Sequence, residues 1–323
     1  MSRCPHKGCN APEMSCMQGE EIEDCPAWKA RVKSGPESET VVLTDGLTAR
    51  DLRFPWTGNA MGPADLPYLT GARRVRLLTM AGASDAGKTS LLAAFYLLIA
   101  RGYRPEGVEF AGSLTLEGWE NIAGSLQWNT LNGPTFPAHT SSGGGRSPGM
   151  LHMTLRSTGR DCELLAADAP GEWFADWAVQ RDNPRADGAR WLCERTDVFL
   201  VIADSKALSG PDRGQARQAL LDLLRRVGSE RDGRPAALVW TKSDISVPSG
   251  IQAAIREGAA RSLKDFREFS VSMHPEAGSE SRNKGQGILE LLAWVISAQP
   301  GNREALIPDN DGGALLHTFG SFA

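Results

Sequence analysis

Residues 82–89 of this chain read Gly82-Ala83-Ser84-Asp85-Ala86-Gly87-Lys88-Thr89. Two glycines at this spacing, followed by a lysine and a hydroxyl side chain, match the phosphate-binding loop known as Walker A. In such a loop, backbone N–H groups surround a phosphate, the lysine reaches the β- and γ-phosphates, and the hydroxyl binds Mg²⁺. We therefore predict that residues 82–89 and the adjoining Ser90 bind a nucleotide, with Lys88 and Thr89 in these two roles.

The sequence on either side of this loop predicts a strand that leads into it and a helix that leaves it. Residues 75–81 are short and mainly apolar, as in a buried strand, and residues 91–100 are long and apolar enough for a core helix. A strand–loop–helix unit directs the loop N–H groups and the helix N-terminus at one anion. Gly82 and Gly87 permit the tight, partly left-handed path that such a loop follows.

An acidic residue ends a second predicted strand, where a nucleotide-bound metal is expected. Residues 162–167 are largely apolar and lead into Asp168-Ala169-Pro170-Gly171. A carboxylate at the carboxyl end of a neighbouring strand can hold Mg²⁺ directly or through water. We predict Asp168 as a Mg²⁺ ligand beside Thr89, and the backbone N–H of Gly171 as a contact of the γ-phosphate.

Two later strand ends predict which base is bound. Residues 236–240 lead into Thr241-Lys242-Ser243-Asp244. The Asp244 carboxylate can accept from both the N1–H and the exocyclic amine of guanine, whereas adenine has an acceptor at N1 and no amine at C2. The stem of Lys242 can lie along the base, and Ser270-Val271-Ser272 can offer a hydroxyl and backbone N–H groups to the guanine carbonyl. These elements predict GTP and GDP as ligands and argue against ATP.

The alternation of apolar segments predicts an α/β fold with three layers, in which helices cover both faces of a mostly parallel sheet. One edge is expected to be antiparallel, because a short turn joins the expected strands 150–157 and 162–168 into a hairpin. On that hairpin, His152 alternates with apolar neighbours and is expected on the solvent face. The expected strands are 150–157, 162–168, 197–204, 236–241 and 268–272, and the expected helices are 117–129, 214–227, 250–260 and 286–298.

The order of the motifs resembles that of the Ras-like, translation-factor-related (TRAFAC) P-loop GTPases over about residues 73–300. More narrowly, residues 110–120, Glu172 and residues 195–204 are similar to the double-GTPase-type proteins encoded in bacterial conflict gene clusters. The resemblance implies a nucleotide-dependent switch that hydrolyses GTP and acts on a protein partner. The narrower resemblance implies that this partner belongs to a bacterial defence system.

The resemblance also implies two loops that respond to the γ-phosphate. Switch I would lie in residues 132–145, where Thr140, or Thr135 as the alternative, would bind Mg²⁺ and the γ-phosphate. Switch II would begin at Asp168, and Glu172 stands where Ras-like enzymes often carry the glutamine that positions the attacking water. A carboxylate can accept a hydrogen bond from water but cannot donate one. We therefore expect slow hydrolysis, accelerated by a GTPase-activating partner through the switch loops.

Two alternatives remain open at this point. Without an effective water-positioning group, the protein would be a scaffold that holds GTP or GDP without meaningful turnover. In the switch interpretation, one of three arginines could serve as a built-in arginine finger that supplies positive charge to the transition state: Arg181, Arg185 and Arg190. The alternative is that these arginines lie on a solvated helix face.

Four of the six cysteines fall within the first 25 residues: Cys4, Cys9, Cys16 and Cys25. Four thiolates on a short, loop-rich segment are suited to tetrahedral Zn²⁺, so residues 1–34 are predicted to form a zinc-binding, Cys-rich module. Their spacings match no common zinc-finger template, and a tail with spare thiols is the alternative. Cys162 and Cys193 are expected in the core of the main domain.

The remaining sequence sets the expected context of these sites. Residues 35–72 are expected to be a linker and edge loop, 73–300 a GTPase domain and 301–323 a tail. The net charge of −4 carries no long run of one sign, so nothing indicates direct nucleic-acid binding. The N-terminal residues have no apolar stretch behind them, so no signal peptide is expected, and the longest apolar run, residues 91–100, is too short to span a bilayer. A cytoplasmic protein is expected.

Overall fold

The computed structural model describes residues 24–25, 58–70, 75–124, 126, 148–157, 160–273 and 286–298. The chain divides into two units, residues 1–54 and 55–323. In the first unit only Asp24 and Cys25 are described, and the Cys25 side chain is buried. The predicted division of the N-terminal part into a module and a linker stays a prediction.

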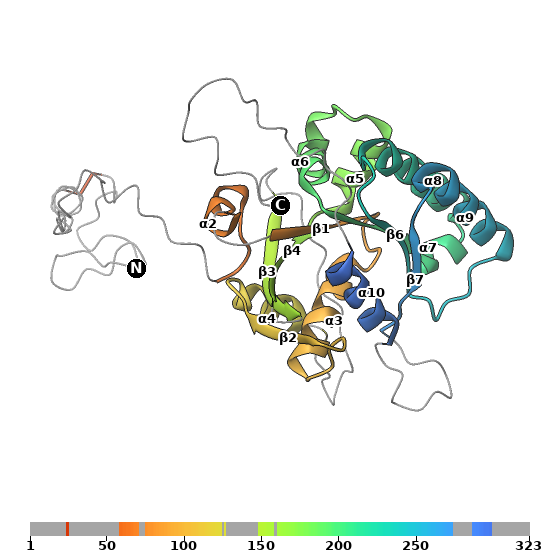
Figure 1. Cartoon of the computed structure of the whole chain (residues 1–323). Helices are drawn as coiled ribbons and strands as arrows, with labels where there is room; N and C mark the ends of the chain where they lie inside the picture. Colours follow the sequence, from red (N-terminus) through yellow and green to blue (C-terminus); the bar gives the residue numbers. More distant parts are fainter. Residues whose placement is uncertain are drawn as a thin grey trace, which may run out of the picture. The chain divides into compact units, whose positions relative to one another are not determined.

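The second unit contains one seven-stranded sheet (Figure 1), in the order β2-β3-β4-β1-β5-β6-β7. β3 runs antiparallel to both of its neighbours, and every other pair in the sheet is parallel. The predicted α/β class, with a mostly parallel sheet and an antiparallel hairpin, is therefore confirmed. The strands are β1 Val75–Ala81, β2 Val108–Gly112, β3 Gly149–Ser157, β4 Arg160–Asp168, β5 Val198–Asp204, β6 Ala236–Thr241 and β7 Arg267–Ser270.

The central strands are apolar at almost every position because both faces of the sheet are covered. On β5, Phe199 and Val201 point into one core, whereas Leu200 and Ile202 point into the other. This alternation follows from the two-residue period of a strand. Continuous apolar runs, rather than alternating ones, were therefore the correct sign of the parallel strands.

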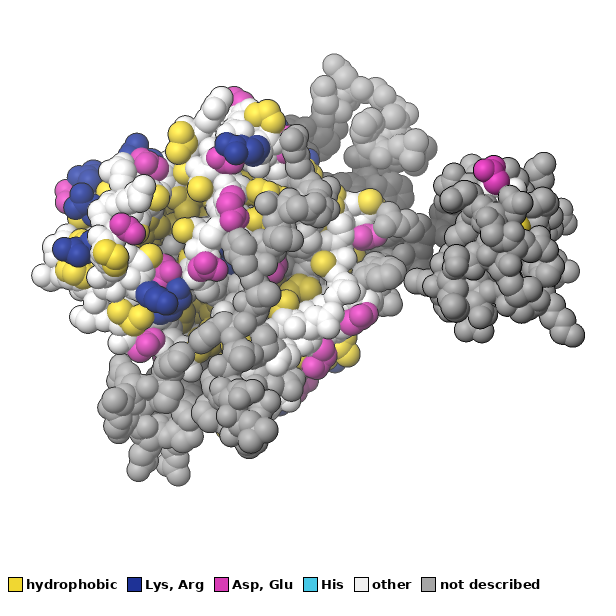
Figure 2. All heavy atoms as spheres, turned by 180° about the vertical axis from the view of Figure 1, so that it is seen from behind, with side chains coloured by type: hydrophobic (Ala, Val, Ile, Leu, Met, Phe, Trp, Pro, Cys, Tyr) yellow, Lys and Arg dark blue, Asp and Glu magenta, His cyan; other side chains and the backbone are white. Residues whose placement is uncertain are grey.

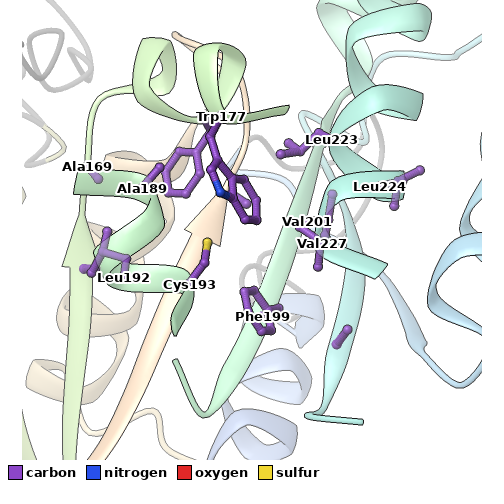
Figure 3. Close-up of a cluster of buried hydrophobic side chains, with 14 of the residues drawn as sticks. Ala169, Trp177, Ala189, Leu192, Cys193, Phe199, Val201, Leu223, Leu224 and Val227 are labelled. Carbon is purple, nitrogen blue, oxygen red and sulfur yellow. The ribbon is translucent and has the colours of Figure 1, made fainter. Parts of the chain in front are cut away.

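Helices pack on both faces of this sheet. The cores that they form show that α3, α4 and α10 share one face and that α5 to α9 share the other. Figure 3 shows part of the second core, where Trp177 of α5 approaches Leu223 of α8 and Val201 of β5. The helices are α2 Pro67–Thr70, α3 Lys88–Ala100, α4 Leu116–Gly124, α5 Gly171–Val179, α6 Asp187–Arg195, α7 Ser205–Ser209, α8 Arg213–Glu230, α9 Ser249–Leu263 and α10 Gln286–Ser297, with short 3-10 turns at Pro63–Asp65 and Pro184–Ala186.

The segment of residues 58–70, which precedes the phosphate-binding loop, packs against β3 and α4. Met61 is buried and exchanges two backbone hydrogen bonds with Met150, of 2.8 and 2.9 Å. Gly118 of α4 donates its backbone N–H to the Gly58 carbonyl, at 3.2 Å. This segment therefore bridges to the start of β3, beyond the residues of β3 that pair with β2.

The prediction that His152 faces solvent is wrong. The side chain is 2% exposed, and its Nδ1 accepts from the backbone N–H of Leu114 at 2.9 Å, so Nε2 carries the proton. That Nε2–H donates to Glu163, at 2.7 Å from Oε2, and Thr154 donates to the same oxygen at 2.6 Å. The turn before α4 covers this face of β3, and the alternating pattern could not reveal a cover contributed by a segment almost 40 residues away.

The two cysteines that were expected in the core differ in burial. Cys193 of α6 is 2% exposed, and burial raises the pKa of its thiol strongly, so it is confirmed as a core residue. Cys162 of β4 is only partly buried. No helix in the part of the chain that the structure describes is long and apolar enough to cross a membrane.

Candidate nucleotide-binding site

The loop between β1 and α3 has the backbone form that a phosphate-binding loop needs. Gly87 immediately precedes α3 and has φ 85°, and Asp85 also lies in the left-handed region, with φ 58°. A Cβ on Gly82 would lie 2.8 Å from Cβ of Ile202 on the neighbouring β5. The first glycine is therefore required by packing and the second by its backbone conformation.

Lys88 lies at the start of α3 with its ammonium turned back over the loop. Its Nζ donates to the carbonyl of Gly82 at 3.1 Å and to that of Ala83 at 2.7 Å. Burial lowers the pKa of Lys88 to about 8, against the opposing effect of the nearby carboxylates of Asp168 and Glu172. A buried cation in this position favours the approach of an anion, because a negative charge restores the stability of its charged form.

The two predicted Mg²⁺ ligands meet at the carboxyl end of the central strands of the sheet. β1 and β4 are parallel neighbours, so the end of β4 lies beside the loop that follows β1. There the Thr89 hydroxyl donates to Oδ1 of Asp168, at 2.8 Å. The structure thus brings together a hydroxyl and a carboxylate from residues 79 positions apart.

Gly171 packs directly on the phosphate-binding loop. A Cβ on this residue would lie 2.1 Å from the backbone nitrogen of Ser84 and 2.3 Å from the carbonyl carbon of Ala83. No other residue type fits there without a shift of the backbone. Gly171 is also the first residue of α5, and Glu172 follows it with an exposed side chain. The start of α5 and the loop are therefore in contact.

The residues predicted to select the base are joined to the same loop. Thr241 donates from its hydroxyl to the Ala86 carbonyl at 2.8 Å. Lys242 has a left-handed backbone, with φ 52°, and its Nζ donates to the Asp85 carbonyl at 2.7 Å. The end of β6 and the phosphate-binding loop thus form one hydrogen-bonded framework.

Among the three predicted residues of the last strand end, only Ser272 reaches the base motif through its side chain. Its hydroxyl donates to Oδ1 of Asp244, whose side chain is exposed. Ser270 is exposed on β7, and Val271 has a buried side chain. The backbone of Val271 donates to Trp240 at 2.8 Å and accepts from Ser243 at 3.2 Å, which fixes the position of the turn that carries Asp244.

A model of the Double-GTPase 2 family matches residues 76–295, about two thirds of the chain. The matched range contains the phosphate-binding loop, Asp168 and the base motif, and ends within α10. The chain belongs to the Double-GTPase 2 family. The predicted relationship to double-GTPase-type P-loop GTPases is thereby confirmed, and membership indicates GTP binding and GTPase activity as the functional class. None of the curated proteins matches the sequence.

Asp204 falls within residues 195–204, on which the family resemblance partly rests, but no role in the site was predicted for it; this residue ends β5 in the Double-GTPase 2 domain. Its Oδ2 accepts from Lys242 Nζ, at 2.8 Å. A signal for it was present, because an acidic residue at the carboxyl end of a parallel strand lies where such sheets bind ligands. Asp204 also contributes to the wall of a largely apolar cavity of about 310 Å³ beside the phosphate-binding loop, between α5, α7 and α8.

The three arginines considered as a built-in finger all pair with carboxylates. Arg181 lies 2.7 Å from Glu230, and Arg185 lies 3.3 Å from Asp176. The third pair, Arg190 with Asp187, spans 2.8 Å. Figure 2 shows acidic and basic side chains interspersed on one face of the molecule. These contacts favour the solvated-surface alternative over the arginine finger.

Several predicted residues of this Double-GTPase 2 protein lie outside the described residues: Thr135, Thr140, Cys4, Cys9 and Cys16. Switch I and the zinc site therefore stay predictions. Within the described ranges, no group of three or more His, Cys, Asp and Glu side chains is placed to hold a metal ion. Cys25 is the one member of the predicted zinc set that the structure describes, and it is buried.

Proposed function

We propose that this protein binds GTP with Mg²⁺, hydrolyses it slowly to GDP and phosphate, and presents different surfaces to a protein partner in the two states. The observation that carries the proposal is that Thr241 and Lys242 bond to the carbonyls of Ala86 and Asp85 in the phosphate-binding loop. The base site and the phosphate site would thus share one framework, as a single bound nucleotide requires.

Binding of the triphosphate would rest on the loop and on Lys88. The N–H groups of the loop and the N-terminus of α3 supply partial positive charge, and the buried ammonium supplies a full one. Because burial lowers the pKa of Lys88 to about 8, its charge is incompletely compensated in the absence of nucleotide. A phosphate within contact distance would relieve that cost.

The residues at the end of β4 fit a Mg²⁺ ion. The hydroxyl of Thr89 and the carboxylate of Asp168 are the hard oxygen ligands that this ion prefers, and they already lie one hydrogen bond apart. When bound, Mg²⁺ supplies neutralisation of phosphate charge. Thr140, with Thr135 as the alternative, is proposed as a further ligand from switch I.

In the hydrolysis step, a water oxygen forms a bond to the γ-phosphorus while the bond to the bridging oxygen of GDP breaks. One proton of the water stays on the attacking oxygen, and the other passes to a second oxygen of the same phosphoryl group, so that GDP leaves and phosphate is released as H2PO4⁻. Glu172, exposed on the first turn of α5 beside Gly171, would accept a hydrogen bond from this water and orient it. It cannot donate a hydrogen bond, and its negative charge opposes the approach of phosphate. The intrinsic rate would therefore be low, and an activating protein would raise it.

The contact of Gly171 with Ala83 and Ser84 supports the switch itself. A γ-phosphate that accepts from the Gly171 N–H would hold the start of α5, and its loss on hydrolysis would release it. A partner that contacts α5 could thereby distinguish the two states. The double-GTPase relationship favours a partner in a bacterial defence system.

A second function, a scaffold that holds GTP or GDP without turnover, is favoured by one observation. Glu172 replaces the glutamine that Ras-like enzymes use to orient water. In this case the Cys-rich segment would recruit the partner, which would respond to nucleotide occupancy alone. Substitution of Glu172 would then change no output.

Calorimetric titration of nucleotide-stripped protein with Mg²⁺-GTP, Mg²⁺-GDP and Mg²⁺-ATP, with phosphate release followed on the same sample, separates these possibilities. The switch predicts guanine-selective binding with slow release of phosphate. Guanine-selective binding without release would favour the scaffold. Preferential binding of ATP would contradict both. Lys88→Ala serves as the binding-deficient control, and Lys206→Ala, which removes an exposed lysine of α7, serves as its matched counterpart.

A further inference from the structure

Asp204 occupies a junction between three segments of the site. Its Oδ2 accepts from Lys242 Nζ at 2.8 Å, and its Oδ1 accepts from the backbone N–H of Lys206 at 2.9 Å. The second bond makes Asp204 the N-cap of α7. Each carboxylate oxygen therefore has its own partner, one in the base motif and one in the adjoining helix.

The ammonium of Lys242 connects Asp204 to the phosphate-binding loop. The same Nζ donates to the Asp85 carbonyl at 2.7 Å. Both Lys242 and Asp85 have left-handed backbones, with φ 52° and 58°. Non-glycine residues persist in this region only when surrounding contacts hold them. The Lys242 ammonium thus links the two turns that have left-handed residues, and Asp204 forms an ion pair with this ammonium.

A fully exposed ion pair would not hold Lys242 in one position, because exposed pairs contribute little to stability. Here the side chains of Asp204 and Lys242 are only 12% and 29% exposed. The pair also joins residues 38 positions apart and is completed by a third, backbone partner in the loop. Its geometry is therefore set by the ends of β5 and β6, and it is partly screened from water.

We propose that Asp204 is a positioning residue for the guanine nucleotide, which it serves by fixing Lys242 across the base and against Asp85. This inference rests on the proposed function. With its ammonium held by Asp204, Lys242 keeps its stem along the base and away from the phosphates, which are left to Lys88. Asp204 then controls how long the nucleotide stays bound, equally for GDP and GTP.

The substitution Asp204→Asn separates the two tasks of this side chain. Asparagine retains a good N-cap for α7 but loses the charge that holds Lys242. Dissociation of fluorescently labelled GDP and of a labelled, non-hydrolysable GTP analogue is measured by stopped flow. We expect both dissociation rates to rise by about tenfold, since loss of one partner of a partly buried charge pair acts mainly on dissociation. The melting temperature should stay at the wild-type value.

The matched control is Asp222→Asn on α8. Asp222 contributes to the same cavity wall, and the described hydrogen bonds and ion pair of its carboxylate go to Gln218 and Arg225 of its own helix rather than to the base motif. Both dissociation rates should therefore remain unchanged. A second variant, Lys242→Met, should accelerate dissociation by itself. Adding Asp204→Asn to Lys242→Met should then produce no further acceleration, because the two residues act through one bond.

Three outcomes would overturn the inference alone: wild-type dissociation rates in Asp204→Asn, full acceleration by Asp204→Asn in the Lys242→Met background, or acceleration for only one of the two nucleotides. If the wild-type protein binds no guanine nucleotide, the proposed function fails first, and the inference fails with it. If Asp204→Asn lowers the melting temperature, the Lys242→Met background still decides, because there a structural effect would persist and a positioning effect would not.

Discussion

The hydroxyl of Thr89 lies 2.8 Å from Oδ1 of Asp168, to which it donates a hydrogen bond. Thr89 stands in the first turn of α3, and Asp168 is the last residue of β4. Because β1 and β4 are adjacent and parallel, this contact closes the space between the phosphate-binding loop and the neighbouring strand. The carboxyl end of the sheet thereby carries a hydroxyl and a carboxylate next to the loop over which the Lys88 ammonium lies.

The lowered pKa of Lys88 predicts how the stability of the nucleotide-free protein depends on pH. Its ordinary value of 10.5 falls to about 8 on folding, so between these values the unfolded chain binds more protons than the folded one. Stability contributed by this group therefore rises with pH across that window, by up to about 3 kcal/mol at its upper end.

Urea unfolding at pH 7.5 and pH 9.5 of wild type and Lys88→Met checks this prediction. The variant has no titrating group at this position, so wild type should gain about 2 kcal/mol relative to it over that interval. A constant difference between the two proteins would show that Lys88 titrates normally.

Gly171→Ala should impair the response to the γ-phosphate. The added Cβ would lie 2.1 Å from the Ser84 nitrogen, so the start of α5 must move away from the loop. We expect a loss of stability of about 1–3 kcal/mol and a larger loss of affinity for GTP than for GDP. Gly214→Ala on α8 is the matched control, because its Cβ would meet no atom within 4 Å. Equal losses for GTP and GDP would place the effect in the loop alone.

Substitutions of Glu172 should alter turnover without altering binding. Glutamine can both accept from water and donate to phosphate, so Glu172→Gln should raise the rate of phosphate release by about tenfold, whereas Glu172→Ala should lower it. Single-turnover release from preformed Mg²⁺-GTP complexes measures both rates. Identical release from all three proteins would remove Glu172 from the catalytic machinery.

The buried pair of His152 and Glu163 should contribute stability and not nucleotide affinity. His152→Ala leaves the Glu163 carboxylate without its 2.7 Å partner in a buried setting, which should cost about 3 kcal/mol. Thermal unfolding measures the loss of stability. Titration with GDP, at a temperature at which both proteins remain folded, should give the wild-type affinity. Arg156→Ala, which removes an exposed ion pair on the same strand, should leave the melting temperature close to the wild-type value.

Much of the fold was predictable because its strongest signals are local. β1, the loop and α3 follow from apolar runs around a glycine-rich octapeptide, and β6 begins and ends where it was expected, at 236 and 241. The parallel strands were recognisable because burial on both faces leaves almost every position apolar. These features need no knowledge of which distant segments come together.

The features that were missed all depend on long-range packing. His152 is buried because the turn before α4 closes over β3, and an alternating strand pattern is the same with or without that cover. Asp204 accepts a hydrogen bond from Lys242, which lies 38 positions later in the sequence. In the run of 270–272, only Ser272 lies past the end of β7 with its hydroxyl on Asp244, and the sequence could not tell which serine would follow the strand end.

The central claim, that Asp244 selects guanine, is tested most directly by binding of GTP and xanthosine triphosphate to wild type and to Asp244→Asn. Xanthine carries a carbonyl where guanine has its amine, and an asparagine amide can donate to that carbonyl while a carboxylate cannot. We predict that wild type prefers GTP and that Asp244→Asn prefers xanthosine triphosphate, with a change in the affinity ratio of at least about 100-fold. An unchanged ratio between the two nucleotides would contradict the account.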